Sequence, residues 1–117
     1  MKRIYIAGPY SSDNVIGVLD NIRDGMRVGT KVLLAGFAPF VPWFDFHFQL
    51  MLREGENLSV QDYYDYSIAW LLASDAMLVH RLSKNSVGTI REIEIAEQNL
   101  IPVYYSLAGL IQFEGEK

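Results

Sequence analysis

The chain has 117 residues and a net charge of −4, half of its residues are hydrophobic, and it has no cysteine. This length predicts a single domain over residues 1–117, and the absence of thiols excludes disulfides, thiolate metal sites and a cysteine nucleophile. An acidic chain without a cluster of Lys and Arg is not expected to bind duplex nucleic acid. With no signal peptide and no apolar run of membrane-spanning length, we expect a cytoplasmic protein without a membrane partner.

The first half of the chain combines two short apolar runs with one long helical pattern. Residues 3–7 are apolar and β-rich, which predicts a buried strand ended by the Gly-Pro pair that follows. Apolar positions at helical spacing then predict an amphipathic helix over residues 14–35. Residues 37–42 predict a second strand, which its two prolines place at an edge of the sheet. The aromatic segment 43–48 gives no clear prediction.

The second half continues the alternation of helices and strands. Ser59 and Asp62 form a capping-box pattern at the start of a helix. The patterns predict two strands and three helices: strands over residues 76–80 and 101–105, and helices over residues 59–74, 87–98 and 107–112. Such alternation implies parallel strands joined by right-handed crossovers. We therefore predict a Rossmann-like or flavodoxin-like three-layer α/β sandwich with a parallel sheet of four or five strands.

In sheets of this kind, ligands bind beyond the carboxyl ends of the strands, where the start of the helix at 87–98 is the most informative segment. Ser86 and Gly88 stand where free backbone N–H groups and the helix dipole favour an anion. Ser86 either caps this helix or holds an anion with its hydroxyl. Glu92 lies one turn further along the same face, near Tyr5 on the first strand. A lone glutamate on a helix is commonly a solvated residue, and its place beside the anion site favours a function.

Other site classes find little support in the sequence. The motifs of serine hydrolases, dinucleotide-binding proteins and P-loop proteins are absent. His47 and His80 have no spacing typical of metal ligands, so we expect no metal. Asp75 precedes its strand, at the end of the sheet opposite the expected site, and is interpreted as a turn residue.

Five motifs, in order along nearly the whole chain, carry a resemblance to a known family. They are IYIAGPY at 4–10, APFVP at 38–42, WLLASDA at 70–76, SVGTIRE at 86–92 and IPVYYS at 101–106. This set resembles the nucleoside 2-deoxyribosyltransferase superfamily, which includes nucleoside 5′-monophosphate N-glycosidases and short phage and bacterial relatives. The resemblance implies an enzyme that cleaves the N-glycosidic bond of a (deoxy)nucleoside or its 5′-monophosphate, by hydrolysis or by transfer of the sugar.

The resemblance also assigns roles to residues. Glu92 matches the nucleophile that forms a glycosyl-enzyme intermediate, and Tyr5 matches the tyrosine that holds it by a hydrogen bond. No metal or organic cofactor is implied, the partner is a small nucleoside or nucleotide, and a homodimer or larger homo-oligomer is expected.

Ser86 bears on the choice between nucleosides and monophosphates. The nucleoside transferases tend to have Asp at this position and the monophosphate hydrolases Ser, and a hydroxyl at a helix N-terminus suits a phosphate better than a carboxylate does. The hydrolase pattern of the first loop is only partly present, because Gly8 matches and the residues after it do not. The candidate substrate-binding residues are Gly8, Tyr10, Ser11, Trp43, Asp45, Ser86 and Gly88, with Lys84 and Asn85 as further phosphate contacts.

One position departs from the family pattern. Ser67 stands where the family has an Asp that assists the leaving base. Either Asp65 or Asp45 serves in its place or the leaving base is activated differently, and we include Asp65 among the candidate catalytic residues. The alternatives are a catalytically lapsed protein that binds or senses a nucleotide, and an interaction protein that uses the aromatic segment 43–48 as an interface.

Overall fold

The computed structural model describes residues 1–81 and 86–115. Within them lies one sheet of four parallel strands: β1 (Arg3–Ala7), β2 (Ala38–Phe40), β3 (Ala76–Val79) and β4 (Val103–Tyr104). The strand order is β2-β1-β3-β4, which puts β2 at an edge, as its prolines predicted. This order is that of the flavodoxin-like sheet, and the predicted α/β class is confirmed.

The described residues form five α-helices and one 3₁₀ helix. They are α1 (Val15–Leu34), η1 (Pro42–Asp45), α2 (Phe46–Met51), α3 (Val60–Leu72), α4 (Val87–Gln98) and α5 (Leu107–Glu114). The aromatic segment without a clear prediction folds as η1 and α2. None of the helices in this part of the chain is long and apolar enough to cross a membrane.

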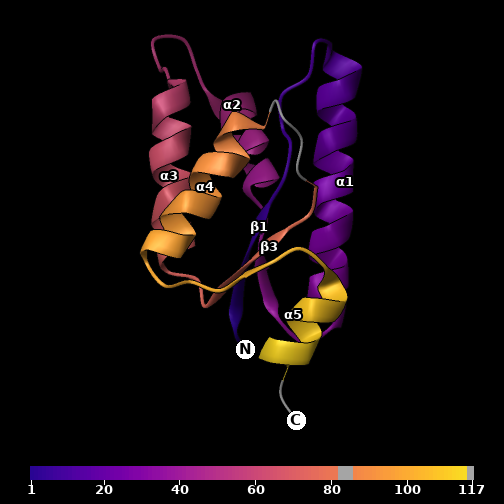
Figure 1. Ribbon diagram of the computed structural model, residues 1–117. Coiled ribbons are helices and arrows are strands. Elements are labelled where there is room, and N and C mark those ends of the chain that lie inside the picture. The colour runs from indigo at the N-terminus through magenta and orange to yellow at the C-terminus, as the bar shows by residue number, and fades with distance from the viewer. Residues whose placement is uncertain (82–85, 116–117) are drawn as a thin grey trace.

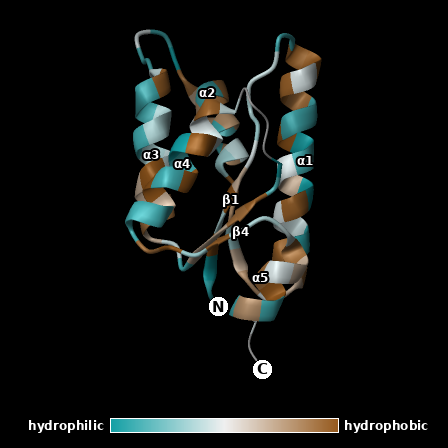
Figure 2. Cartoon of the chain, in the orientation of Figure 1, coloured by the Kyte–Doolittle hydropathy of each residue, from teal (hydrophilic) through white to brown (hydrophobic). Residues whose placement is uncertain are grey.

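The helices form a layer on each face of the sheet, with α1 and α5 on one side and α3 and α4 on the other (Figure 1). Alternate residues of β1 divide between the two cores, as the period of a strand requires. Ile4 and Ile6 belong to a cluster with Val32 of α1, whereas Tyr5 belongs to a cluster with Leu71 of α3. Figure 2 shows hydrophobic colouring on the central strands and mixed colouring along α1 and α3, as expected for helices with one buried face.

Side chains fix where the helices begin. The Ser59 hydroxyl accepts a hydrogen bond from the Asp62 N–H, and the Asp62 carboxylate accepts one from the Ser59 N–H, so the predicted capping box is confirmed. Asn14 caps α1 and Ser106 caps α5 in the simpler way, by accepting a backbone N–H three residues on.

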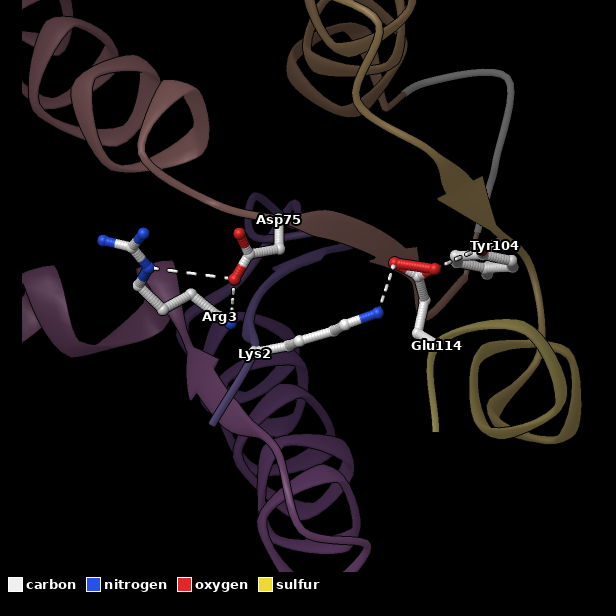
Figure 3. A network of polar contacts seen from close by, with 5 residues as sticks. All are labelled: Lys2, Arg3, Asp75, Tyr104 and Glu114. Carbon is white, nitrogen blue, oxygen red and sulfur yellow. Dashed lines mark hydrogen bonds and ion pairs between the residues drawn. The ribbon is translucent and has the colours of Figure 1, made fainter. Parts of the chain in front are cut away.

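At the amino ends of the strands, charged residues tie the chain together (Figure 3). Asp75 accepts a hydrogen bond from the Arg3 N–H at 2.7 Å and lies 3.8 Å from the Arg3 Nε. Lys2 pairs with Glu114, which also accepts from the Tyr104 hydroxyl. The interpretation of Asp75 as a turn residue is confirmed, because its carboxylate joins the starts of β1 and β3.

At the carboxyl ends, the chain leaves neighbouring strands on opposite faces. The segment after β1 leads to α1 on one face, and the segment after β3 leads to α4 on the other. β1 and β3 are adjacent, and a crevice opens where crossovers diverge in this way.

Candidate active site

A cavity of about 510 Å³ lies beyond the carboxyl ends of β1 and β2, beside the start of α4. Its volume is in the range of roughly 300–1,000 Å³ typical of small-molecule sites. The lining combines backbone from the loop after β1, aromatic side chains from η1, α2 and α3, and polar side chains from α4. The residues are Tyr5, Ala7, Gly8, Pro9, Tyr10, Ser11, Pro42, Trp43, Asp45, Phe46, Gln49, Val60, Tyr63, Tyr64, Ser67, Ile68, Ser86, Val87, Gly88, Thr89, Arg91 and Glu92.

Tyr5 and Glu92 meet in the wall of this cavity. The Tyr5 hydroxyl donates a hydrogen bond to the Glu92 Oε2, joining β1 to α4 across 87 positions of the sequence. Tyr5 is completely buried, and Glu92 is partly buried. Glu94 is exposed on the same helix. The contact holds one carboxylate oxygen in place and leaves the carboxyl group facing the cavity.

The surroundings of Glu92 change its acidity. Burial raises the pKa of Glu92 from 4.5 to about 7, although the hydrogen bond from Tyr5 acts in the opposite direction. Burial also raises the pKa of the Tyr5 hydroxyl well above 10, and the adjacent carboxylate adds to that shift. Near neutral pH, Glu92 is thus poised between its two protonation states while Tyr5 remains a hydrogen-bond donor, an arrangement common in active sites.

Aromatic stacking fixes the ring of Tyr5. Phe40 lies between Tyr5 and Trp70, with ring centroids 5.6 Å and 5.4 Å away and interplanar angles of 22° and 17°. Ser67, almost buried on α3, makes a hydrogen bond to the Tyr5 hydroxyl that lowers the pKa of the tyrosine. The residue that departs from the family pattern therefore contacts the Tyr5–Glu92 pair.

A second carboxyl group, that of Asp45, lies in the same cavity. It accepts hydrogen bonds from the Tyr10 hydroxyl and from the Phe46 N–H. Burial raises the pKa of Asp45 from 3.8, and these two hydrogen bonds act against that shift.

The loop after β1 is held from two sides. The Trp43 Nε1 donates to the Pro9 carbonyl at 3.0 Å. Asn21 of α1 donates to the carbonyl oxygens of Tyr10 and Ser11, and its own carbonyl accepts from the Arg81 Nη2 at 3.0 Å. These contacts give the loop a defined path along the cavity.

Trp43 forms part of the core. Only 2% of it is exposed, its indole occupies the space that a Cβ at Gly25 would enter, and it would lie 3.1 Å from a Cβ at Gly8. Trp43 thus contributes a rigid wall to the cavity more than a free surface for stacking. Phe44, half exposed, is not part of the lining.

The start of α4 forms the polar end of the cavity. Ser86 and Thr89 are buried there, and Arg91 is exposed at the rim. Ser86 does not make the side-chain capping bond that Asn14 and Ser59 make at their helices. Helix N–H groups in a first turn have no partner within the helix and remain available to an anion. Lys84 and Asn85, the further phosphate candidates, lie outside the described residues.

The structure brings nearly all of the predicted site residues together. Of those that the structure describes, every one lines the cavity except Asp65. Asp65 is exposed on α3 and accepts a hydrogen bond from the Gln61 side chain at 2.8 Å. At 100° per residue, it lies about 200° around the helix from Ser67, which faces the cavity. The structure therefore places Asp65 outside the cavity, away from the other candidate site residues.

Gly88 has room for a side chain. A Cβ at this position would lie 3.7 Å from the Tyr64 Cε1, which is an ordinary contact. The fold therefore does not require glycine here, and any need for close approach must come from a ligand.

Several lining residues were not identified from the sequence. The largest group is Val60, Tyr63, Tyr64 and Ile68 of α3, which together with Ser67 form a stripe at helical spacing. Their spacing of three, four, seven and eight residues was the signal that could have revealed one face of the helix turned toward the site. Arg91 and Thr89 were also missed, although both lie within a turn of Glu92.

The described residues contain no group of three or more His, Asp or Glu side chains placed to hold a metal ion. Comparison with protein-family models and with curated protein sequences found no match to the chain. The function is therefore argued from the cavity.

Proposed function

We propose that the cavity binds a (deoxy)nucleoside or its 5′-monophosphate and that the protein cleaves the N-glycosidic bond with Glu92 as the nucleophile. The observation that carries this proposal is the hydrogen bond from Tyr5 to Glu92 in the wall of a ligand-sized cavity. The resemblance of the sequence to nucleoside 2-deoxyribosyltransferases supports the same assignment.

In the proposed reaction, one Glu92 oxygen attacks the anomeric carbon while Tyr5 holds the other oxygen. Attack requires the ionised carboxylate, and the bond to the base breaks through an oxocarbenium-like transition state. The resulting sugar ester is released by water, which gives hydrolysis, or by a second base, which gives transfer. Stacking of Tyr5 on Phe40 limits the freedom of the pair and so supports a fixed line of attack.

The polar end of the cavity supports a monophosphate as substrate. Ser86, the first turn of α4 and Arg91 offer hydroxyl, N–H and guanidinium donors, and no carboxylate lies among the described residues of this turn. Phosphate binds well to such a set. Ser11 lies exposed at the rim of the cavity and adds a further hydroxyl.

The test incubates the protein with ribo- and deoxyribonucleosides and their 5′-monophosphates and resolves free bases by liquid chromatography. Glu92→Gln is the test variant, and Glu94→Gln, an exposed glutamate on the same helix, is the matched control. We expect base release that is lost in Glu92→Gln and kept in Glu94→Gln. Turnover by Glu92→Gln at the wild-type rate would show that Glu92 is not the nucleophile.

Ser67 favours a second candidate function, a protein that binds a nucleotide without cleaving it. The position that carries Asp in the family here carries a hydroxyl in contact with Tyr5. This candidate predicts that a nucleotide raises the melting temperature while no base is released.

A further inference from the structure

The two carboxyl groups of the cavity come from opposite sides of the central strand. Among the described lining residues, only Asp45 and Glu92 carry a carboxyl group. Asp45 ends η1, which follows β2, and Glu92 belongs to α4, which follows β3. β2 and β3 are the two neighbours of β1. A ligand beyond the end of β1 is therefore placed between the two acids.

The surroundings of Asp45 are mostly phenolic. Its carboxyl accepts the hydroxyl of Tyr10 from the loop after β1. Burial raises the pKa of Tyr63 and of Tyr66 on α3, and the nearby charge of Asp45 raises both further. The same charge contributes to the raised pKa of Tyr5. Among the described residues, no cation is one of the groups that shift the pKa of Asp45, and burial favours its protonated form.

Cleavage of an N-glycosidic bond needs a proton for the departing base, and the other groups of the cavity are poor donors of one. Arginine guanidinium groups do not act as proton donors in proteins. Burial makes Tyr5 and Tyr10 weaker acids than a free phenol. Ser67 is engaged with the Tyr5 hydroxyl. Among the described lining residues, Asp45 is the one carboxylic acid besides Glu92, and the Tyr10 hydroxyl donates a hydrogen bond to it.

We propose that Asp45 is the acid that protonates the leaving nucleobase, with Tyr10 as its positioning residue. This inference rests on the proposed function. As Glu92 bonds to the anomeric carbon, the bond from that carbon to the base nitrogen breaks and its electron pair passes to the base. The Asp45 proton moves to the base, which leaves neutral, and Asp45 is left ionised. When water attacks the anomeric carbon, the ester to Glu92 breaks and Asp45 takes up the proton of the water.

The experiment compares two leaving groups in Asp45→Asn. One substrate is whichever compound of the panel the wild type cleaves fastest. The other is a form of it whose base departs readily without a proton, N7-methylated for a purine or 5-nitro-substituted for a pyrimidine. We expect kcat to fall by roughly 10²- to 10⁴-fold on the first, the usual contribution of general acid catalysis, and by less than about tenfold on the second. Glu92→Gln should lose both.

Three further variants make the comparison decisive. Asp20→Asn, an exposed aspartate paired with Arg23 on α1, should leave both rates unchanged. Tyr10→Phe keeps the carboxyl but removes its partner, so it should show a smaller loss with the same preference for the activated base. It also replaces Asp45→Asn if circular dichroism shows that variant to be unfolded. Asp65→Asn tests whether Asp65 supplies the proton in place of Asp45.

Equal losses on both leaving groups, or no loss on either, would overturn the assignment of Asp45. A loss on the unmodified substrate in Asp65→Asn alone would move the role there. These outcomes leave the proposed function standing, because Glu92→Gln remains inactive in each. Release of no base by the wild type from any compound would remove both proposals together.

Discussion

Burial of Glu92 leads to a prediction about stability that does not depend on catalysis. The pKa of Glu92 rises from 4.5 to about 7 because burial disfavours the carboxylate. One pKa unit corresponds to about 1.36 kcal/mol, so ionised Glu92 lowers the free energy of unfolding by roughly 3 kcal/mol relative to a neutral group. Glu92→Gln removes the ionisation and keeps an acceptor for the Tyr5 hydroxyl. We therefore expect this variant to be more stable than the wild type at alkaline pH.

The sign follows from the order in which the two states release the proton. Below pH 4.5 the carboxyl group is neutral in both the folded and the unfolded protein, and Glu92 carries no penalty. As the pH rises toward about 7, the unfolded chain ionises first and the folded state loses stability. Above that pH both states are ionised, and the loss is complete.

Urea unfolding of the wild type and Glu92→Gln at about pH 5 and about pH 9 measures this effect. The stability gained by the substitution should grow by about 2–3 kcal/mol between these conditions. Glu94→Gln, at an exposed position, should show no such growth. An equal difference between wild type and Glu92→Gln at both pH values would refute the argument, because Glu92 would then not be a buried ionisable group.

Further predictions concern the site, the core and assembly. In Tyr5→Phe the pKa of Glu92 should rise above its wild-type value, since the lost hydrogen bond lowers it, and the acidic limb of the pH–rate profile should move to higher pH. Gly25→Ala should lower the free energy of unfolding by roughly 1–3 kcal/mol, because the new Cβ meets the Trp43 ring. Gly88→Ala, with room for its Cβ, should leave stability unchanged or raise it by up to about 1 kcal/mol in urea unfolding. Light scattering after size exclusion should give a homodimer or larger.

The fold was predictable because its signals are local. Hydrophobic periods and caps placed every described element except η1 and α2 within a few residues, and the two prolines marked β2 as an edge strand. The fourth strand is shorter than predicted. It was expected from Ile101, but Pro102 has no N–H to donate, and pairing is confined to Val103 and Tyr104.

The site was predictable where residues follow the ends of strands. Tyr5, Ser86 and Glu92 belong to segments whose position in a parallel sheet is set by topology, so their convergence could be expected. The hydrogen bond between Asn21 and Arg81 could not be predicted, because these residues lie 60 positions apart and no sequence motif links them. Asp65 precedes Ser67 by two positions, and the period of the helix turns it to a face away from the cavity.

Trp43 connects the segment after β1 to the segment after β2, and both segments line the cavity. Its indole leaves no room for a Cβ at Gly25, and its N–H donates to the carbonyl of Pro9, which precedes Tyr10. Asp45 follows Trp43 by two residues in the chain. The position of Tyr10 relative to Asp45 therefore depends on the Trp43 ring. The residues of α3 that line the cavity are not held by Trp43. Related proteins that bind different ligands should therefore differ first at these α3 positions.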